Sequence, residues 1–170
     1  MSRHKEPAVD RRKTLLQSFR LLPLLALLAA AGCGEEKPFS LQIHPAVLAT
    51  DGQRQAGWEK IDFAGGPRAP AGTYYAIPET LMTEWNIVTS KSAGEQEDGM
   101  AVAVRLNAYA SRSFARFASD PNHTKQPLAL RVDGRWVDIS PLLAPPGDRL
   151  LLYGLTAGEF ERLEAYIKQK

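Results

Sequence analysis

The pair Asp133-Gly134 stands between two apolar runs and limits the fold more than any other feature of this sequence. Leu128, Leu130 and Val132 alternate with other residues before it, and residues 136–139 continue the apolar pattern after it. Asp-Gly in this position predicts a two-residue hairpin, because a type I′ turn needs a positive φ at both central residues. An antiparallel pair of strands is therefore expected here.

Two apolar stripes with helical spacing lie on either side of this hairpin. The stripe before it consists of Ala110, Phe114, Phe117 and Ala118, and the stripe after it of Phe160, Leu163 and Ile167. Thr156 and Glu159 can form a capping box at the start of the second segment, because each side chain can bond a backbone N–H of the other residue. Both segments are therefore predicted to be helices.

The order of elements from residue 100 onward indicates the fold class. Residues 100–106 alternate as a strand, and residues 149–153 form another, so the order is strand, helix, strand, strand, strand, helix. Hairpins rather than βαβ crossovers join the middle strands. We therefore expect an α+β domain with a largely antiparallel sheet and two helices packed on one face.

Residues 39–99 are expected to add strands and loops to the same domain. The alternation over residues 39–47 predicts a half-buried strand, and the Gly- and Pro-containing residues 50–71 are predicted to be mainly loop. Residues 81–90 fit either a helix or a strand. The acidic residues 92–99 are predicted to be an exposed turn.

The first 32 residues have the composition of an export signal. Six basic residues precede an uncharged, mostly apolar run at residues 21–32, which is shorter than the roughly 20 residues that a membrane span needs. Small residues end this run, and Cys33, the only cysteine of the chain, follows directly. This arrangement resembles a bacterial lipobox, in which the cysteine is acylated and becomes the new N-terminus. An ordinary signal peptide or an N-terminal anchor is the alternative.

Cleavage before Cys33 would divide the chain into a signal peptide (1–32), a lipid-anchored tether (33–38), N-terminal strands and loops (39–99) and an α+β core (100–170). The net charge changes from +2 for the whole chain to −2 for the mature part, which keeps 15 basic and 17 acidic residues. A nucleic-acid footprint needs clustered Lys and Arg on the folded domain. The expected partners are therefore a membrane, through lipid on Cys33, and exported or envelope proteins, but no nucleic acid.

Two segments carry a resemblance to a known family. Residues 127–135 (PLALRVDGR) resemble the "lAivlDG" hairpin in the head subdomain of the first periplasmic domain of SecD-type protein-export subunits. Residues 153–159 (YGLTAGE) are similar to the stretch that opens the closing helix of that subdomain. The resemblance implies a SecD-head-like fold, an extracytoplasmic location and a capacity to contact exported polypeptides. It does not imply translocase activity, which in SecD depends on transmembrane helices.

The remaining polar residues do not form a catalytic or metal-binding pattern. His44 and His123 have no cysteine or carboxylate partner at metal-ligand spacing. Asp133 and Asp138 flank the hairpin and are interpreted as a turn residue and a strand-edge charge. The acidic residues 95–98 are interpreted as solvated loop. We therefore expect no enzymatic activity, no metal and no cofactor.

Trp136 is the candidate peptide contact. It is opposite in phase to Val137 and Ile139, so it points away from the helices if those two residues face them. An exposed Trp on a sheet could bind a peptide, because Trp is enriched at binding hot spots. Packing beneath residues 39–77 is the alternative for this side chain.

Three functions are consistent with these observations. The first is a lipid-anchored extracytoplasmic binding or accessory module. The second is a small envelope enzyme, such as a hydrolase, whose polar cluster is assembled only by folding, for instance His44 with Asp62 or His123 with Asp120. The third is a structural envelope lipoprotein, which an exposed apolar patch without a pocket would favour.

Overall fold

The predicted hairpin is present, and φ is positive at both central residues, 50° at Asp133 and 85° at Gly134. It joins strands β7 (Pro127–Val132) and β8 (Arg135–Pro141) in the computed structural model, which describes residues 37–50 and 55–170. Pro38–Lys170 form one compact unit. The Asp-Gly signal therefore predicted this turn correctly.

The other elements follow the expected order from residue 100 onward. The strands are β1 (Leu41–Leu48), β2 (Glu59–Phe63), β3 (Gly72–Ala76), β4 (Met82–Thr83), β5 (Ile87–Gln96), β6 (Gly99–Leu106) and β9 (Arg149–Leu155). The helices are α2 (Ala108–Ser119) and α3 (Ala157–Lys168), with short 3₁₀ turns η1 (Glu84–Asn86) and η2 (Pro121–His123). The predicted capping box starts α3, where the Glu159 N–H donates to Thr156 Oγ1 (3.2 Å) and the Thr156 N–H to Glu159 Oε2 (2.8 Å).

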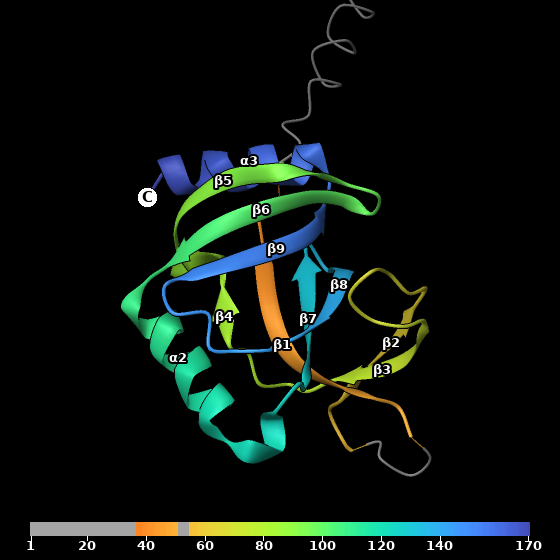
Figure 1. Cartoon of the computed structure of the whole chain (residues 1–170). Coiled ribbons are helices and arrows are strands. Elements are labelled where there is room, and N and C mark those ends of the chain that lie inside the picture. The colour runs from red at the N-terminus through yellow and green to blue at the C-terminus, as the bar shows by residue number, and fades with distance from the viewer. Residues whose placement is uncertain (1–36, 51–54) are drawn as a thin grey trace, which may run out of the picture. The chain divides into compact units, whose positions relative to one another are not determined.

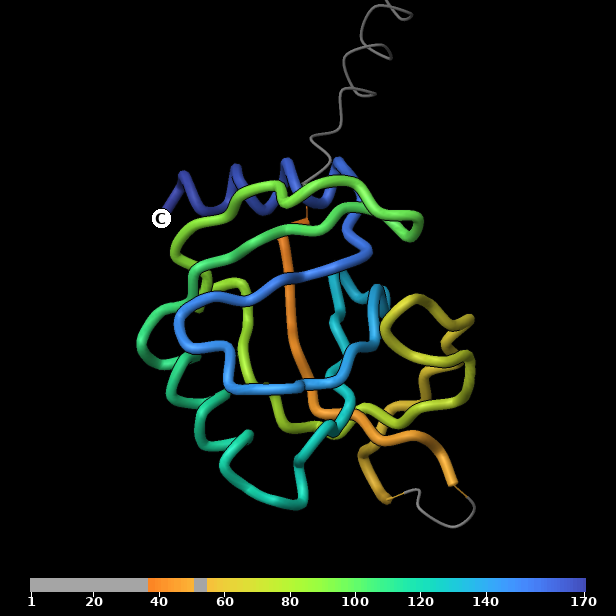
Figure 2. The backbone as a smooth tube through the Cα atoms, in the orientation of Figure 1, coloured from red at the N-terminus to blue at the C-terminus, as the bar shows by residue number. Residues whose placement is uncertain are grey.

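The strands form two antiparallel sheets where the sequence predicted one. The larger sheet has the order β2-β3-β1-β7-β8, with β4 also paired to β1, and the smaller has the order β5-β6-β9. Figure 1 shows the smaller sheet crossing in front of β1, β4 and β7, and Figure 2 shows the same path of the backbone. The α+β class and the antiparallel pairing are confirmed. The number of sheets differs because alternation indicates which face of a strand is buried, not which strand it pairs with.

The main apolar core joins both sheets and both helices. Helix α2 buries Ala110, Phe114 and Phe117, as its stripe predicted, and α3 buries Leu163. A smaller cluster under β2 and β3 includes Ala46, Ile61, Tyr74, Ala129 and Ile139, with Trp136 packed against it. Residues 39–99 thus supply strands to both sheets.

Residues 92–99 are mostly strand, so the prediction of an exposed turn there was wrong. Strand β5 continues to Gln96 and β6 begins at Gly99, which leaves only residues 97–98 for the turn. This part of β5 is exposed on both faces, so its sequence has no apolar alternation to reveal a strand. Residues 81–90, which fitted either a helix or a strand, contain β4, η1 and the start of β5.

A one-residue bulge in β8 reverses the faces that the sequence predicted after Trp136. Leu130 pairs with Asp138, whereas regular pairing from this hairpin would place it opposite Val137. An extra residue moves every later side chain to the other face of the strand. Asp138 therefore shares the inner face with Leu130, and Ile139 lies in the smaller cluster with Trp136. The expectations that Val137 and Ile139 share a face and that Asp138 is a strand-edge charge were wrong for this reason.

Strand β9 approaches the bulge closely at Gly154. A Cβ atom at this position would lie 3.0 Å from Val137 Cγ1 and 3.1 Å from the Val137 carbonyl oxygen, and φ of Gly154 is +75°. Strand β9 also has a register shift against β6 at this point, between Leu152 and Leu155. The two irregular strand segments therefore meet here because residue 154 has no side chain.

Gly154→Ala is expected to lower the free energy of unfolding by about 1–3 kcal/mol, the usual cost of a non-glycine residue held in the left-handed region. Gly158→Ala is the control, because no neighbouring atom lies within 4 Å of a Cβ at that helical position. It is expected to be neutral or to stabilise by about 0.5–1 kcal/mol. Urea unfolding of the full chain measures both, and equal stability of the Gly154→Ala variant and the parent would contradict the close approach.

Candidate functional site

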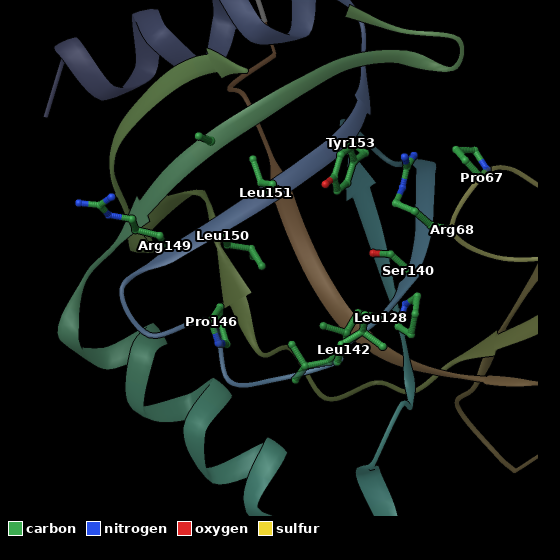
Figure 3. Close-up of a pocket in the computed structure, with 13 residues that line it drawn as sticks. Pro67, Arg68, Leu128, Ser140, Leu142, Pro146, Arg149, Leu150, Leu151 and Tyr153 are labelled. Atoms are coloured by element: carbon green, nitrogen blue, oxygen red, sulfur yellow. The ribbon is translucent and has the colours of Figure 1, made fainter. Parts of the chain in front are cut away.

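A groove of about 760 Å³ opens where the two sheets part, between β8 and β9. Strand β8 ends the larger sheet and β9 ends the smaller one. The two strands meet at Val137 and Gly154 and then diverge, so the groove lies toward the Arg149 end of β9. Figure 3 shows Leu150, Leu151 and Tyr153 on one side of it.

The walls of this groove are mainly apolar. Strand β9 supplies leucines and Tyr153, and the opposite wall comes from Leu128 of β7 and from the end of β8 and the loop after it, including Leu142 and Pro146. Leu143 and Leu151 leave 75% and 47% of their surface exposed. Large apolar side chains that stay in contact with water next to a concave surface are typical of a binding site.

Arg68 forms the polar end of the groove. It lies in the loop between β2 and β3, where Gly65 has a φ of +92° and a Cβ would lie 2.9 Å from the Ala71 nitrogen. The Gly66 N–H donates to the Ala69 carbonyl (3.0 Å), which closes a tight turn around Arg68. The glycine pair therefore lets this loop present the guanidinium to the groove.

The guanidinium of Arg68 connects four separate segments. Its Nε and Nη2 donate to Asp138 Oδ1 of β8 at 3.2 and 3.1 Å, and Nη2 also donates to Asp98 in the β5–β6 turn. Its Cζ lies 3.9 Å from the centroid of the Tyr153 ring of β9. One side chain thus ties the β2–β3 loop to both sheets at the point where the groove begins.

At this end of the groove one cation, Arg68, bonds to two carboxylates, those of Asp98 and Asp138. Burial raises the pKa of Asp138, and the hydrogen bonds and charge of Arg68 oppose that rise without cancelling it. Burial alone would lower the pKa of Arg68, but the bonds and charges of Asp138 and Asp98 raise it above its ordinary value. Arg68 therefore stays charged and engaged with its two carboxylates.

Trp136 lies outside the groove, on the other face of β8. Its Nε1 donates to Glu59 Oε1 (3.0 Å), and its ring meets the His44 ring edge-on with the centroids 5.7 Å apart. These contacts place the indole against residues 39–77, the alternative location for this side chain. A peptide contact at Trp136 stays a prediction, and Cys33 lies outside the described residues.

His44 and His123 make local contacts away from the groove. His44 Nδ1 lies 3.2 and 3.0 Å from the backbone carbonyl oxygens of Ile77 and Glu79. The His123 ring stacks on Phe117 with the centroids 4.1 Å apart, and its Nε2 lies 4.0 Å from an Asp120 oxygen. The carboxylate of Asp62, the other candidate partner, bonds instead to Lys60 and Thr73.

Residues 37–50 and 55–170 contain neither a metal-binding cluster nor a membrane-spanning helix. No three His, Cys, Asp or Glu side chains in these ranges come together closely enough to hold a metal ion. No helix in the same ranges is long and apolar enough to cross a membrane.

The sequence did not reveal Arg68, Asp98 or Tyr153 as site residues. Arg68 and Asp98 belong to turns, where no periodicity marks a side chain as buried or exposed. The one available signal was Gly65-Gly66-Pro67 directly before Arg68, which indicates a tight turn but not what the turn contacts.

No protein-family model matches the chain, and no curated protein matches it. Among the solved structures that resemble it, two are of SecDF and have low sequence identity. One is a structure of SecDF, a membrane component that enhances protein export, with 13% identity, a TM-score of 0.49, and coverage of 96% of this chain and 71% of that one. The other is SecDF in a super-membrane-facing form, with 12% identity, a TM-score of 0.47, and coverage of 76% and 18%. The assignment to the SecD head stays a prediction.

Arg68→Met is expected to lower the free energy of unfolding by about 3 kcal/mol at pH 7, because it leaves the buried Asp138 carboxylate without its cation. The control is Lys60→Met, which removes an exposed cation 2.9 Å from Asp62 and should cost less than about 1 kcal/mol. Adding Asp138→Asn to Arg68→Met should recover part of the loss. Urea unfolding gives all three values.

The loss caused by Arg68→Met should depend on pH. Burial raises the pKa of Asp138, and removal of Arg68 raises it further because the opposing charge is gone. A carboxyl with a raised pKa in the folded state stabilises the fold below its ordinary pKa of 3.8, and that contribution is lost as pH rises through the raised pKa. The deficit should therefore be smaller at about pH 4 than at pH 7. A deficit that is constant over this range would contradict the assigned role of Asp138.

Proposed function

We propose that this chain is a lipid-anchored, extracytoplasmic binding module whose groove holds an apolar polypeptide segment in extended conformation. The anchor is Cys33, which follows a basic, apolar and small-residue leader as in a lipobox. The observation that carries the binding role is the apolar groove along the edge of β9. The module acts by binding rather than by catalysis, and it is not a translocase.

The groove follows the backbone edge of β9 rather than one face of the strand. Arg149, Leu150 and Leu151 are consecutive, and all three line it. Consecutive side chains of a strand point to opposite faces, so a cavity bordered by all three runs along the edge between those faces. Within the described residues β9 pairs only with β6, so its other edge faces the groove.

A polypeptide suits this groove better than a compact ligand. An edge strand offers backbone N–H and C=O groups that a peptide added as a further strand can pair with. The flanking leucines provide apolar contacts for alternate side chains of that peptide.

Exported or envelope polypeptides are the proposed clients. Before they fold, such chains expose extended apolar segments that match the groove. The sequence resemblance of residues 127–135 and 153–159 to the SecD head is consistent with this role. The rings of His44 and His123 are occupied by local contacts outside the groove, which supports binding rather than hydrolysis as the activity.

Leu151→Glu is expected to weaken peptide binding by about tenfold or more, because it replaces an apolar contact of the groove with a charge. The matched control is Leu48→Glu, since both leucines are 47% exposed and Leu48 does not line the groove. The probe is a fluorescent peptide of about eight residues that alternates Val and Thr. Anisotropy is measured with the full chain in detergent.

The same peptide tests the pairing with β9. Methylation of the backbone nitrogens that face β9 removes the N–H donors and should abolish binding, whereas methylation on the opposite edge should leave it unchanged. Equal effects of both patterns, or equal affinities of the Leu151→Glu and Leu48→Glu variants, would contradict the groove as a strand-binding site. Binding of a fatty acid but not of the peptide would do the same.

Lipid attachment is tested separately. Cells expressing the parent chain and given labelled palmitate should label it, and the Cys33→Ala variant should stay unlabelled. Mass spectrometry of the purified parent should find the lipid on a mature N-terminal Cys33. Label that persists in the variant would contradict this anchor.

A further inference from the structure

A second exposed apolar surface lies at η1, separate from the groove. We call it the aromatic patch and define it by Trp85, Val88 and Tyr109. Trp85 and Tyr109 are 65% and 67% exposed. Trp85 and Val88 flank Asn86, whose carbonyl accepts the N–H of Asn107 (2.8 Å), two residues before Tyr109. This hydrogen bond joins η1 to the residue before α2, so Tyr109 at the start of α2 is two residues from the junction, where it also lines a hollow with Arg112, Ser113 and Arg116.

The indole of Trp85 is held in place although it is exposed. Its ring meets the Tyr166 ring edge-on, with the centroids 5.6 Å apart and the planes at 82°. Lys170 Nζ lies 5.4 Å from both ring centroids and donates to the Trp85 carbonyl at 2.6 Å. The Trp85 ring is thus exposed to solvent but held in one position, with the Lys170 ammonium beside it.

The patch is close to the start of the domain. The Tyr166 ring, which contacts Trp85, also lies 6.3 Å from the Phe39 ring. Glu84 of η1 accepts the N–H of Leu41, the first residue of β1, at 2.9 Å. The Glu84 side chain, which precedes Trp85 in the sequence, is thus bonded directly to β1.

The tether limits how far the patch can lie from the anchor. Six residues lead from Cys33 to Phe39, and a fully extended chain of that length spans about 20 Å. If lipid on Cys33 holds the chain at a membrane, Phe39 stays within about 20 Å of that surface. The Tyr166 ring packs beside Phe39, and the Trp85 ring packs beside Tyr166, so both rings lie near this end of the domain.

We propose that the aromatic patch rests on the interfacial region of the phospholipid bilayer to which Cys33 tethers the chain. This contact depends on the proposed anchor but not on peptide binding. Trp and Tyr concentrate at the boundary between headgroups and acyl chains, because the apolar ring enters the boundary while its polar atom stays hydrated. Lys170 Nζ donates to the Glu84, Trp85 and Ile87 carbonyls, so it holds the segment that carries Trp85 in place. Contact at the patch would leave the groove between β8 and β9 to take peptide.

The test uses the full lipidated chain in phosphatidylcholine vesicles with brominated acyl chains, which quench nearby Trp emission. The variant Trp58→Phe/Trp136→Phe retains only Trp85, and its emission should fall by about twofold relative to vesicles without bromine. The control variant Trp85→Phe/Trp136→Phe retains Trp58, which packs on Tyr75 with the ring centroids 6.3 Å apart. Its emission should not change. Circular dichroism checks that both variants are folded.

The outcomes separate this inference from the proposed function. A lipidated chain in which Trp85 is not quenched, or is quenched no more than Trp58, overturns the bilayer contact and leaves the anchor intact. A chain that carries no lipid on Cys33 overturns both. Peptide affinity is measured on the same variants and should be unchanged by Trp85→Phe. If peptide binding fails while Trp85 is quenched, the groove proposal fails and the bilayer contact stands.

Discussion

The contact between Arg68 and Asp138 is the interaction on which the groove depends. A carboxylate on the inner face of a sheet would be costly to bury alone. The guanidinium bonds it and at the same time reaches Asp98 and the Tyr153 ring. The guanidinium of Arg68 therefore holds together the β2–β3 loop, β8, the β5–β6 turn and β9. The groove begins beside this side chain.

The irregular segments of β8 and β9 explain why a groove exists. The bulge at Val137 moves Asp138 and Ser140 to the inner face, and Gly154 lets β9 lie against that bulge. Two terminal strands of different sheets meet at this point and then diverge. Within the described residues, β8 pairs only with β7 and β9 only with β6, and the proposed peptide would occupy the groove between their other edges.

The two exposed apolar surfaces suit different partners because their chemistry differs. The groove is concave, follows a strand edge and is lined by leucines, so it matches an extended chain. The aromatic patch carries two large rings and lies near a lysine, and it belongs to the end of the domain where β1 begins. These differences support a module that is held at a membrane through one surface and binds through another.

The sequence by itself determined the elements that local geometry controls. The Asp133-Gly134 turn, the capping box at Thr156 and the stripes of α2 and α3 depend on residues close together in the chain, so their patterns could be read directly. Only the tertiary structure decided the pairing into two sheets, the bulge at Val137 and the contact of Arg68 with Asp138. Seventy residues separate that ion pair. Alternation indicates which face of a strand is buried, but it does not indicate which strand it pairs with or where a bulge adds one residue. No local pattern could therefore predict the groove.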